Sequence, residues 1–148
     1  MLIGEVDDLT AMAMGGIAGH AGLFSTAEDL SQIAAALCRA WRGDDAGGGA
    51  LCERNVIRTF WSPSGIPGST WRLGWDGPAA ANSQAGTRFP RAGVGHLGFT
   101  GCSLWIDPPR DSWIVLLSNR VHPAVPKDDR FKRFRPMLHD AIVDALES

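Results

Sequence analysis

The chain has 148 residues, the usual size of one domain. A hydrophobic content of 45% and a charged content of 20% are typical of a globular protein and exclude a disordered one. The net charge is −2, and no basic stripe or Lys/Arg cluster indicates a nucleic-acid partner. No apolar run approaches 18 residues, so no membrane span is expected, and the acids at Glu5, Asp7 and Asp8 do not fit a signal peptide.

Residues 11–24 are apolar and rich in Gly, which predicts a loop packed against other parts of the molecule. A helix is predicted from Ser25, the expected N-cap of a capping box with Glu28, to the stop sequence GDDAGGG at 43–49. A shorter helix is predicted over residues 51–61.

Residues 62–92 are rich in Pro, Gly, Ser and Ala, which predicts a long irregular loop broken by one short strand at 71–77. The tryptophans of this stretch, Trp71 and Trp75, flank a loop able to roof a cleft, but are expected mainly to pack it down.

Two apolar runs, VGHLGFTGCSLWIDP and SWIVLLSNRV, are joined by PPRD and predict an antiparallel hairpin. The chain closes with a predicted amphipathic helix, with Pro136 in its first turn and His139 on its surface. The residues expected on its buried face are Phe134, Leu138, Ala141, Ile142 and Ala145. Together these elements predict an α/β (α+β) domain in which helices flank an antiparallel sheet.

The sequence contains no pattern of Cys or His residues that is typical of a metal or cofactor site. The cysteines Cys38, Cys52 and Cys102 are too few and too scattered for a disulfide framework or a zinc site, and Cys38 and Cys102 are expected to be buried free thiols. The four histidines have no Asp, Glu or Cys at ligand spacing. We expect neither a metal nor a cofactor.

Two stretches, GGIAGHAGLFSTAEDLSQIA and GHLGFTGCSLWIDPPRDSWIVLLSNRVHP, resemble the C-terminal part of β-lactamase-like serine hydrolases. That superfamily includes class C β-lactamases, low-molecular-weight penicillin-binding proteins and related esterases. The resemblance extends from about Gly4 to Pro123 and is weak across the loop at 62–92. It implies that residues 1–148 form a single partial domain, the C-terminal part of a β-lactamase-related one.

The resemblance gives His96, Leu97 and Gly98 a role, because they match the His-x-Gly form of the family's third active-site motif. It implies that an acyl substrate lies along this strand, with Leu97, Gly98 and Thr100 contacting it and the backbone N–H of Phe99 acting as one oxyanion donor. His96 would bind a substrate carboxylate or support the proton relay. The alternative is a polar side chain on a half-exposed strand face.

Other parts of the family pattern are missing. No serine is followed by lysine at Ser-x-x-Lys spacing, the only lysines are Lys127 and Lys132, and there is no Tyr, so this chain contains no nucleophile motif. Asp7 stands where relatives often have His, and this segment is expected only to cross the sheet and cap a helix. His20 is expected to be a hydrogen-bonded structural residue.

Asn119, Arg120 and His122, in NRVHP, are expected to end a strand and tie the loop to its neighbours. Their matches to the family do not settle the roles of His20 and His122.

Three hypotheses follow. The chain is the C-terminal portion of a serine hydrolase whose missing N-terminal half carries the nucleophile, and exposed apolar surface would mark where that half packs. It is a non-catalytic remnant that binds a peptide or acyl ligand, with a sealed core. It is one subunit of a split enzyme completed by a partner chain. A β-lactam, a D-alanyl peptide and an ester all remain open as the acyl substrate, and the compartment is not determined.

Overall fold

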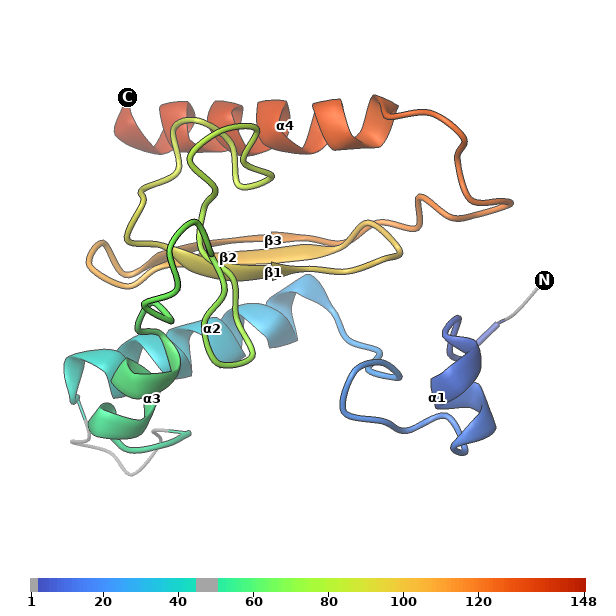
Figure 1. The fold of residues 1–148 in the computed structure, drawn as a ribbon, viewed down its shortest axis with the longest axis horizontal. Helices are drawn as coiled ribbons and strands as arrows, with labels where there is room; N and C mark the ends of the chain where they lie inside the picture. The colour runs from blue at the N-terminus through green and yellow to red at the C-terminus, as the bar shows by residue number, and fades with distance from the viewer. Residues whose placement is uncertain (1–2, 45–50) are drawn as a thin grey trace.

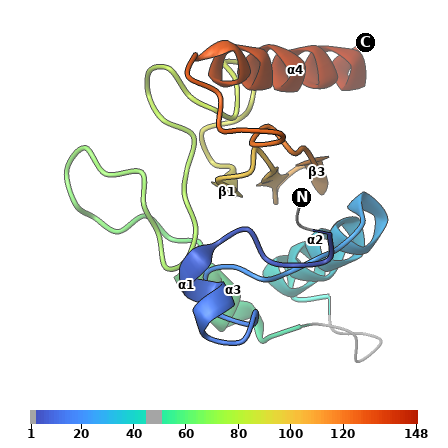
Figure 2. The ribbon, with the colours of Figure 1, turned by 90° about the vertical axis from the view of Figure 1, so that its right-hand side faces the viewer.

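A computed structural model describes residues 3–44 and 51–148 of the chain. The three strands form one antiparallel sheet in the order β1-β2-β3, with α4 over one face and α2 and α3 over the other (Figures 1 and 2). This arrangement confirms the predicted α/β (α+β) architecture. The elements, in chain order, are α1 (Leu9–Ala13), α2 (Ala27–Arg42), α3 (Arg54–Phe60), β1 (Val94–Leu97), β2 (Ser103–Asp107), β3 (Ser112–Leu116) and α4 (Arg130–Glu147).

The central strand β2 supplies a residue to the core on each face of the sheet. Successive side chains of a strand point to opposite faces, so Ile106 packs toward α2 and α3 while Trp105 packs toward α4. Both side chains are fully buried. The first core contains Ala34, Cys38, Ala40, Ile57, Trp61, Val94 and Ile106, and the second contains Ala85, Phe89, Trp105, Ile114 and Val143.

Helix α2 begins one residue later than predicted. The N-cap is Thr26, whose hydroxyl accepts the backbone N–H of Asp29 at 3.1 Å, so the prediction of Ser25 as the cap was wrong. The helix ends at Gly43, whose φ of 83° is the left-handed conformation that glycine adopts most easily. Asp44 follows Gly43, and residues 45–49 of the predicted stop sequence lie outside the described residues. Helix α3 is shorter than the predicted 51–61.

Residues 62–92 leave α3, pass the edge of the sheet at β1 and reach α4 on the other face (Figure 2). The strand predicted at 71–77 is not formed. Asp76 alone makes an isolated antiparallel bridge with Gly95. No strand forms because the segment turns back on itself within residues 70–77. The Gly77 N–H donates to the Thr70 carbonyl, and the Arg72 N–H donates to the Trp75 carbonyl.

The last helix, α4, contains Pro136 in its interior, so the prediction that Pro136 lies in the first turn was wrong. Proline has no N–H, which removes the helical donor for the carbonyl of Lys132, four residues earlier. The side-chain amide of Gln84 donates to that carbonyl at 3.1 Å. The loop before β1 therefore replaces the missing hydrogen bond.

The buried face of α4 also differs from the prediction. Arg135, His139 and Val143 are the buried residues of the helix, at i, i+4 spacing, whereas Phe134 is half exposed. Ala141 and Ala145 of the predicted face are also exposed. Arg135 and His139 of this face contact polar backbone of the loop and of the turn after β1, whereas Val143 joins the second apolar core. Arg135 Nη2, for example, donates to the Gly101 carbonyl at 3.1 Å.

The prediction of His139 as a surface residue was wrong. Its side chain is 0% exposed, with Nδ1 at 3.0 Å from the Gln84 carbonyl and Nε2 at 3.3 Å from Ser103 Oγ. Because the carbonyl only accepts, Nδ1 carries the proton and Nε2 accepts from the serine. Burial lowers the pKa of His139.

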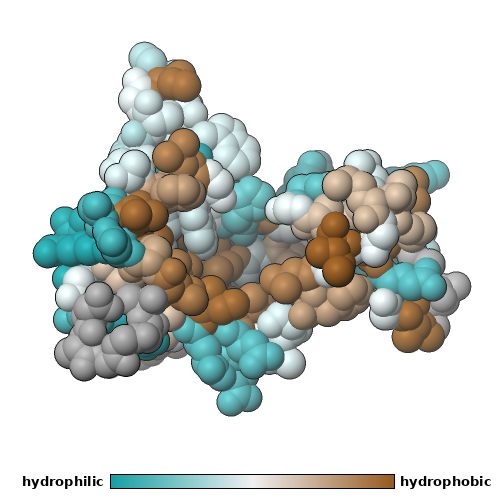
Figure 3. Space-filling view, turned by 90° about the horizontal axis from the view of Figure 1, so that it is seen from below, coloured by the Kyte–Doolittle hydropathy of each residue, from teal (hydrophilic) through white to brown (hydrophobic). Residues whose placement is uncertain are grey.

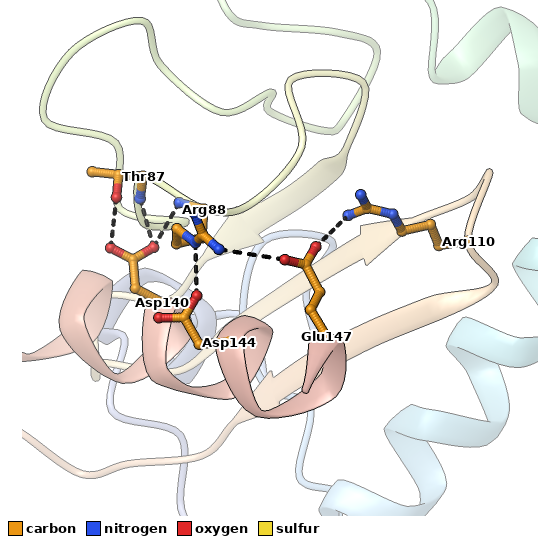
Figure 4. A network of polar contacts seen from close by, with 6 residues as sticks. All are labelled: Thr87, Arg88, Arg110, Asp140, Asp144 and Glu147. Carbon is orange, nitrogen blue, oxygen red and sulfur yellow. Dashed lines mark hydrogen bonds and ion pairs between the residues drawn. The ribbon is translucent and has the colours of Figure 1, made fainter.

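A polar network fastens residues 87–88 to α4 (Figure 4). The Asp140 carboxylate accepts the N–H groups of Thr87 and Arg88 at 2.7 and 2.8 Å and the Thr87 hydroxyl at 2.9 Å. The Arg88 guanidinium pairs with Asp144 at 2.7 Å and with Glu147 at 3.4 Å. The α4 side of the sheet is therefore closed by side chains that belong to this chain.

The segment before α2 is very different. Asp8 caps α1, because its carboxylate accepts the Ala11 N–H at 2.7 Å. The expectation that this segment caps a helix is therefore met by Asp8 and not by Asp7. The segment nevertheless exposes most of its large apolar side chains, and Figure 3 shows apolar surface across this lower face. The exposed side chains are Ile3, Leu9, Met12, Met14, Ile17, Leu23 and Phe24. The prediction that residues 11–24 pack against other parts of the molecule was wrong for most of these side chains.

Free thiols are found at all three cysteines. Cys38 is buried, as predicted, and burial raises its pKa to about 12. Cys102 is only partly buried, since it lies in the turn between β1 and β2. Within residues 3–44 and 51–148, no cluster of three or more His, Cys, Asp or Glu side chains is placed to hold a metal ion. No helix in the same ranges has the length and apolarity to cross a membrane.

Candidate functional site

The predicted third-motif residues lie on β1, at the edge of the sheet. Gly95 exchanges two hydrogen bonds with Asp76, of 2.7 and 2.9 Å, on the side away from β2. Because backbone groups alternate along a strand, the N–H group of Leu97, the last residue of β1, also points away from β2. The Asp76 segment covers the edge only at Gly95, so the stretch from Leu97 onward forms the open part of the edge.

The glycines around this edge differ in what they do. A Cβ at Gly95 would collide with the Trp105 ring, and one at Gly101, where φ is 104°, would collide with Ser118 Oγ. A Cβ at Gly98 would meet nothing closer than Cys102 Cβ at 3.4 Å, an ordinary contact. Internal packing therefore requires glycine at 95 and 101 but not at 98. This is compatible with the expectation that Gly98 leaves room for a ligand, which stays a prediction.

The side chain of His96, on β1, is exposed. Its Nδ1 is 2.8 Å from the Leu97 carbonyl, which places the proton on Nδ1 and leaves Nε2 as the acceptor of a neutral ring. The ring lies beside that of Trp71, with 5.8 Å between centroids and 49° between planes. This geometry suits either a substrate contact or a half-exposed structural histidine, so both readings of His96 stay open.

The two tryptophans of the preceding loop have different roles. Trp75 packs edge-on against Trp61, with centroids 5.7 Å apart, and joins the first core, as predicted. Trp71 is 56% exposed, so the prediction that it packs the loop down was wrong. With His96 it makes an aromatic wall next to the open edge.

Phe99 follows β1 in the turn to β2, and its side chain is 65% exposed. The carbonyl of Gly98, in the same peptide unit as the Phe99 N–H, accepts the Gly101 N–H at 3.0 Å. Within the described part of the chain, the Phe99 N–H itself has no acceptor. An outward-pointing donor in a peptide fixed on its other side is what an oxyanion site requires.

Thr100 is held within the turn. Its hydroxyl is 3.8 Å from Cys102 Sγ, and its carbonyl accepts the Arg120 N–H at 2.9 Å. The role of Thr100 as a substrate contact stays a prediction, and the contacts present are with the protein itself. The expectation that NRVHP ties the loop to its neighbours is confirmed for Arg120.

The other histidines named from the sequence lie elsewhere. His20 Nε2 is 2.9 Å from Asp8 Oδ1, so the expectation of a hydrogen-bonded histidine is confirmed. The hydrogen bond from the Ala11 N–H, followed by that from His20, lowers the pKa of Asp8. His122 is exposed, and its N–H donates to the Asn119 carbonyl at 3.1 Å.

The pair formed by Ser103 and His139 has the hydrogen-bond order of a serine and its general base, and sequence reasoning missed it. Both residues are buried, however, and a nucleophile must be reached by its substrate. The pair therefore serves to dock α4 on β2. The only sequence signal for it was the i, i+4 spacing of Arg135, His139 and Val143.

Comparison with known proteins identifies the family of the chain. The family model described as Beta-lactamase matches residues 3–135. The chain belongs to the Beta-lactamase family. The comparisons thus support a function related to serine hydrolysis, and they agree with a fold that is the C-terminal part of a β-lactamase-like domain.

Two curated relatives carry the same name, "Putative D-alanyl-D-alanine carboxypeptidase". The protein of Escherichia coli strain K12 is 35% identical over 127 residues, and that of Salmonella typhi is 34% identical over 127 residues. Each alignment covers 84% of this chain and 28% of the relative. The chain thus spans less than a third of the length of these relatives. No solved structure matches.

Proposed function

We propose that this chain forms the third-motif wall of a serine hydrolase of the Beta-lactamase family. The observation that carries the proposal is the open edge of β1, where the Phe99 N–H points outward without an acceptor among the described residues. An acyl substrate lies along Leu97 and Gly98 in the manner of an added strand, and its oxygen accepts the Phe99 N–H in the transition state.

The nucleophile comes from outside this chain, because no Ser-x-x-Lys occurs in it. The exposed apolar side chains of residues 3–26 support this arrangement, since such surface usually marks an interface. A self-sufficient ligand-binding remnant is less favoured, because it would seal that surface. Completion by the same polypeptide and completion by a separate subunit both fit the exposed surface.

The names of the curated relatives make a D-alanyl peptide the first substrate to test, beside a β-lactam and a simple ester. His96 Nε2 would meet the carboxylate of such a substrate when protonated, or take part in proton relay when neutral. No metal or cofactor enters this chemistry.

The experiment offers the purified chain a D-alanyl-D-alanine peptide, a chromogenic ester and a chromogenic cephalosporin, together with a serine acylation probe read by intact mass. We expect no turnover and no adduct from the chain alone. We expect both when a portion carrying Ser-x-x-Lys, sought in the upstream coding sequence, is expressed with it. Ser103→Ala is the matched variant. An adduct on the chain alone that disappears in this variant would overturn the proposal.

A further inference from the structure

One side chain, Arg120, braces the turn that carries the outward-pointing Phe99 N–H. Its Nε donates to the Phe99 carbonyl at 2.9 Å, and its guanidinium lies over the Phe99 ring at 5.3 Å from the centroid. Its own backbone N–H donates to the Thr100 carbonyl at 2.9 Å. Arg120 thus holds two consecutive residues of the turn from a position 20 or 21 residues away in the sequence.

The neighbours of Arg120 make this brace tight. Ser118 Oγ also donates to the Thr100 carbonyl, at 3.3 Å, and the Cys102 thiol donates to the Ser118 carbonyl at 3.3 Å. A Cβ at Gly101 would meet Arg120 Cγ at 3.1 Å, so the turn and the arginine stem lie in close contact. The segment after β3 therefore acts as a second support for the turn, in addition to the β1–β2 pairing.

We propose that Arg120 is a positioning residue for the oxyanion donor, an inference that rests on the proposed function. Its side chain acts through the Phe99 carbonyl and the Phe99 ring and leaves the Phe99 N–H itself free, while its backbone N–H, which any substitution keeps, holds the Thr100 carbonyl. Fixing the Phe99 carbonyl limits rotation of the Phe99 backbone, and so helps to hold the preceding Gly98–Phe99 peptide, whose carbonyl accepts the Gly101 N–H, with its own N–H directed away from the turn. A donor contributes to catalysis only if it is already oriented when charge develops on the acyl oxygen.

An arginine suits this position better than a lysine. The planar guanidinium donates through Nε while its face stacks on the Phe99 ring, whereas an ammonium group offers only a point charge on a flexible stem. Arg120→Lys should therefore restore part of what Arg120→Ala removes.

The first test uses the ¹⁵N-labelled chain and needs no catalysis. In Arg120→Ala we expect the backbone order parameter of Phe99 to fall from about 0.85 to below about 0.6, with Arg120→Lys between the two. The fall at Thr100 should be smaller, because its carbonyl keeps the Arg120 backbone N–H and Ser118 Oγ. We expect the Gly101 amide, which bonds to the Gly98 carbonyl, to exchange about tenfold faster or more. A turn that stays rigid in Arg120→Ala would overturn the proposal.

Arg91→Ala is the matched control, because Arg91 also binds two loop carbonyls, those of Ala79 and Ala80, but does not contact this turn. We expect order parameters of Phe99 and Thr100 in this variant equal to those of the unsubstituted chain. A similar loosening in Arg91→Ala would mean that any lost arginine brace disturbs the turn, and would overturn the specific role of Arg120.

The second test uses the protein completed by the portion that carries Ser-x-x-Lys. We expect Arg120→Ala to lower kcat about 10- to 100-fold with KM within about twofold, because orientation affects the transition state more than substrate binding. A rise in KM alone would overturn the positioning role. Absence of turnover by the completed, unsubstituted protein would instead overturn the proposed function, and the NMR result would still decide whether Arg120 orients the turn.

Discussion

The α4 side of the sheet and residues 3–26 differ in whether their side chains find partners within this chain. On the α4 side of the sheet, a buried histidine, a buried arginine and the Asp140 carboxylate each bond to backbone or side chains of the same chain. In residues 3–26, large apolar side chains such as Leu23 and Ile17 lie exposed. The polar groups of the first region find their partners within this chain. The second region exposes apolar side chains to water, which is unfavourable in free energy.

The difference separates a part of the molecule that is self-contained from a part for which we propose an additional partner. The open edge of β1 lies between these two regions in the chain, and its turn is braced from the segment that leads to α4. The proposed site wall can therefore be rigid in this chain even though the sequence contains no Ser-x-x-Lys.

Replacing His139 should have the largest effect. His139→Ala removes hydrogen bonds to the Gln84 carbonyl and Ser103 and leaves a cavity, so we expect a loss of about 3 kcal/mol in the free energy of unfolding. Urea denaturation followed by far-UV circular dichroism measures it. The control is His20→Ala, in the exposed segment, which should leave the denaturation midpoint unchanged. Equal losses in the two variants would contradict the comparison.

Replacing Asp140 should have the next largest effect. Asp140→Ala leaves two N–H groups and the Thr87 hydroxyl without their acceptor, so we expect a loss of about 1–2 kcal/mol in the free energy of unfolding. Asp144→Ala is the matched control, since its pair with Arg88 is exposed and should contribute little. If the two variants lose the same stability, the network in Figure 4 is not what fastens the loop to α4.

The buried His139 also predicts a pH dependence. Its pKa in the folded chain lies below the value of 6.5 in the unfolded chain, so the unfolded state binds the proton more readily. Stability should fall as the pH drops below about 6.5, with a slope of up to about 1.4 kcal/mol per pH unit, until the folded pKa is reached. His139→Gln, which cannot be protonated in this range, should lack this contribution. Identical pH profiles for the two proteins would argue against a neutral, buried His139.

The sequence predicted the layers of the fold because period-2 and period-3.6 patterns report directly on strands and helices. It failed on part of the buried face of α4 because Arg135 and His139 contact the backbone carbonyls of Gly101 and Gln84, which no apolar pattern announces. The carbonyl left free by Pro136 and filled by Gln84 is a contact between residues 48 positions apart. Periodicity within the helix carries no information about it.

The candidate site shows the same division. The resemblance located His96 to Phe99, and the structure places them on an open edge, but the brace from Arg120 depends on how two hairpins bring distant residues together. The exposure of Trp71 was also out of reach, since a tryptophan in a Gly- and Pro-rich loop gives no periodic signal. The resemblance therefore indicated the strand with the His-x-Gly sequence, and only the three-dimensional structure showed the Arg120 contacts from which we propose an orienting role.

The smallest effect on stability should come from the apolar segment before α2. Phe24→Ser replaces a side chain that is 64% exposed, so we expect the free energy of unfolding to change by no more than about 0.5 kcal/mol, together with weaker binding of a hydrophobic dye. Val143→Ser, on the buried face of α4, is the contrasting control and should cost about 2–3 kcal/mol because it places a hydroxyl in the core. A stability loss in Phe24→Ser as large as that in Val143→Ser would mean that the segment packs against its own chain. The exposed surface would then no longer support completion of the site by a further portion. An unchanged stability with reduced dye binding would leave that surface available for the portion that carries the nucleophile, and the same substitution should then weaken assembly with it.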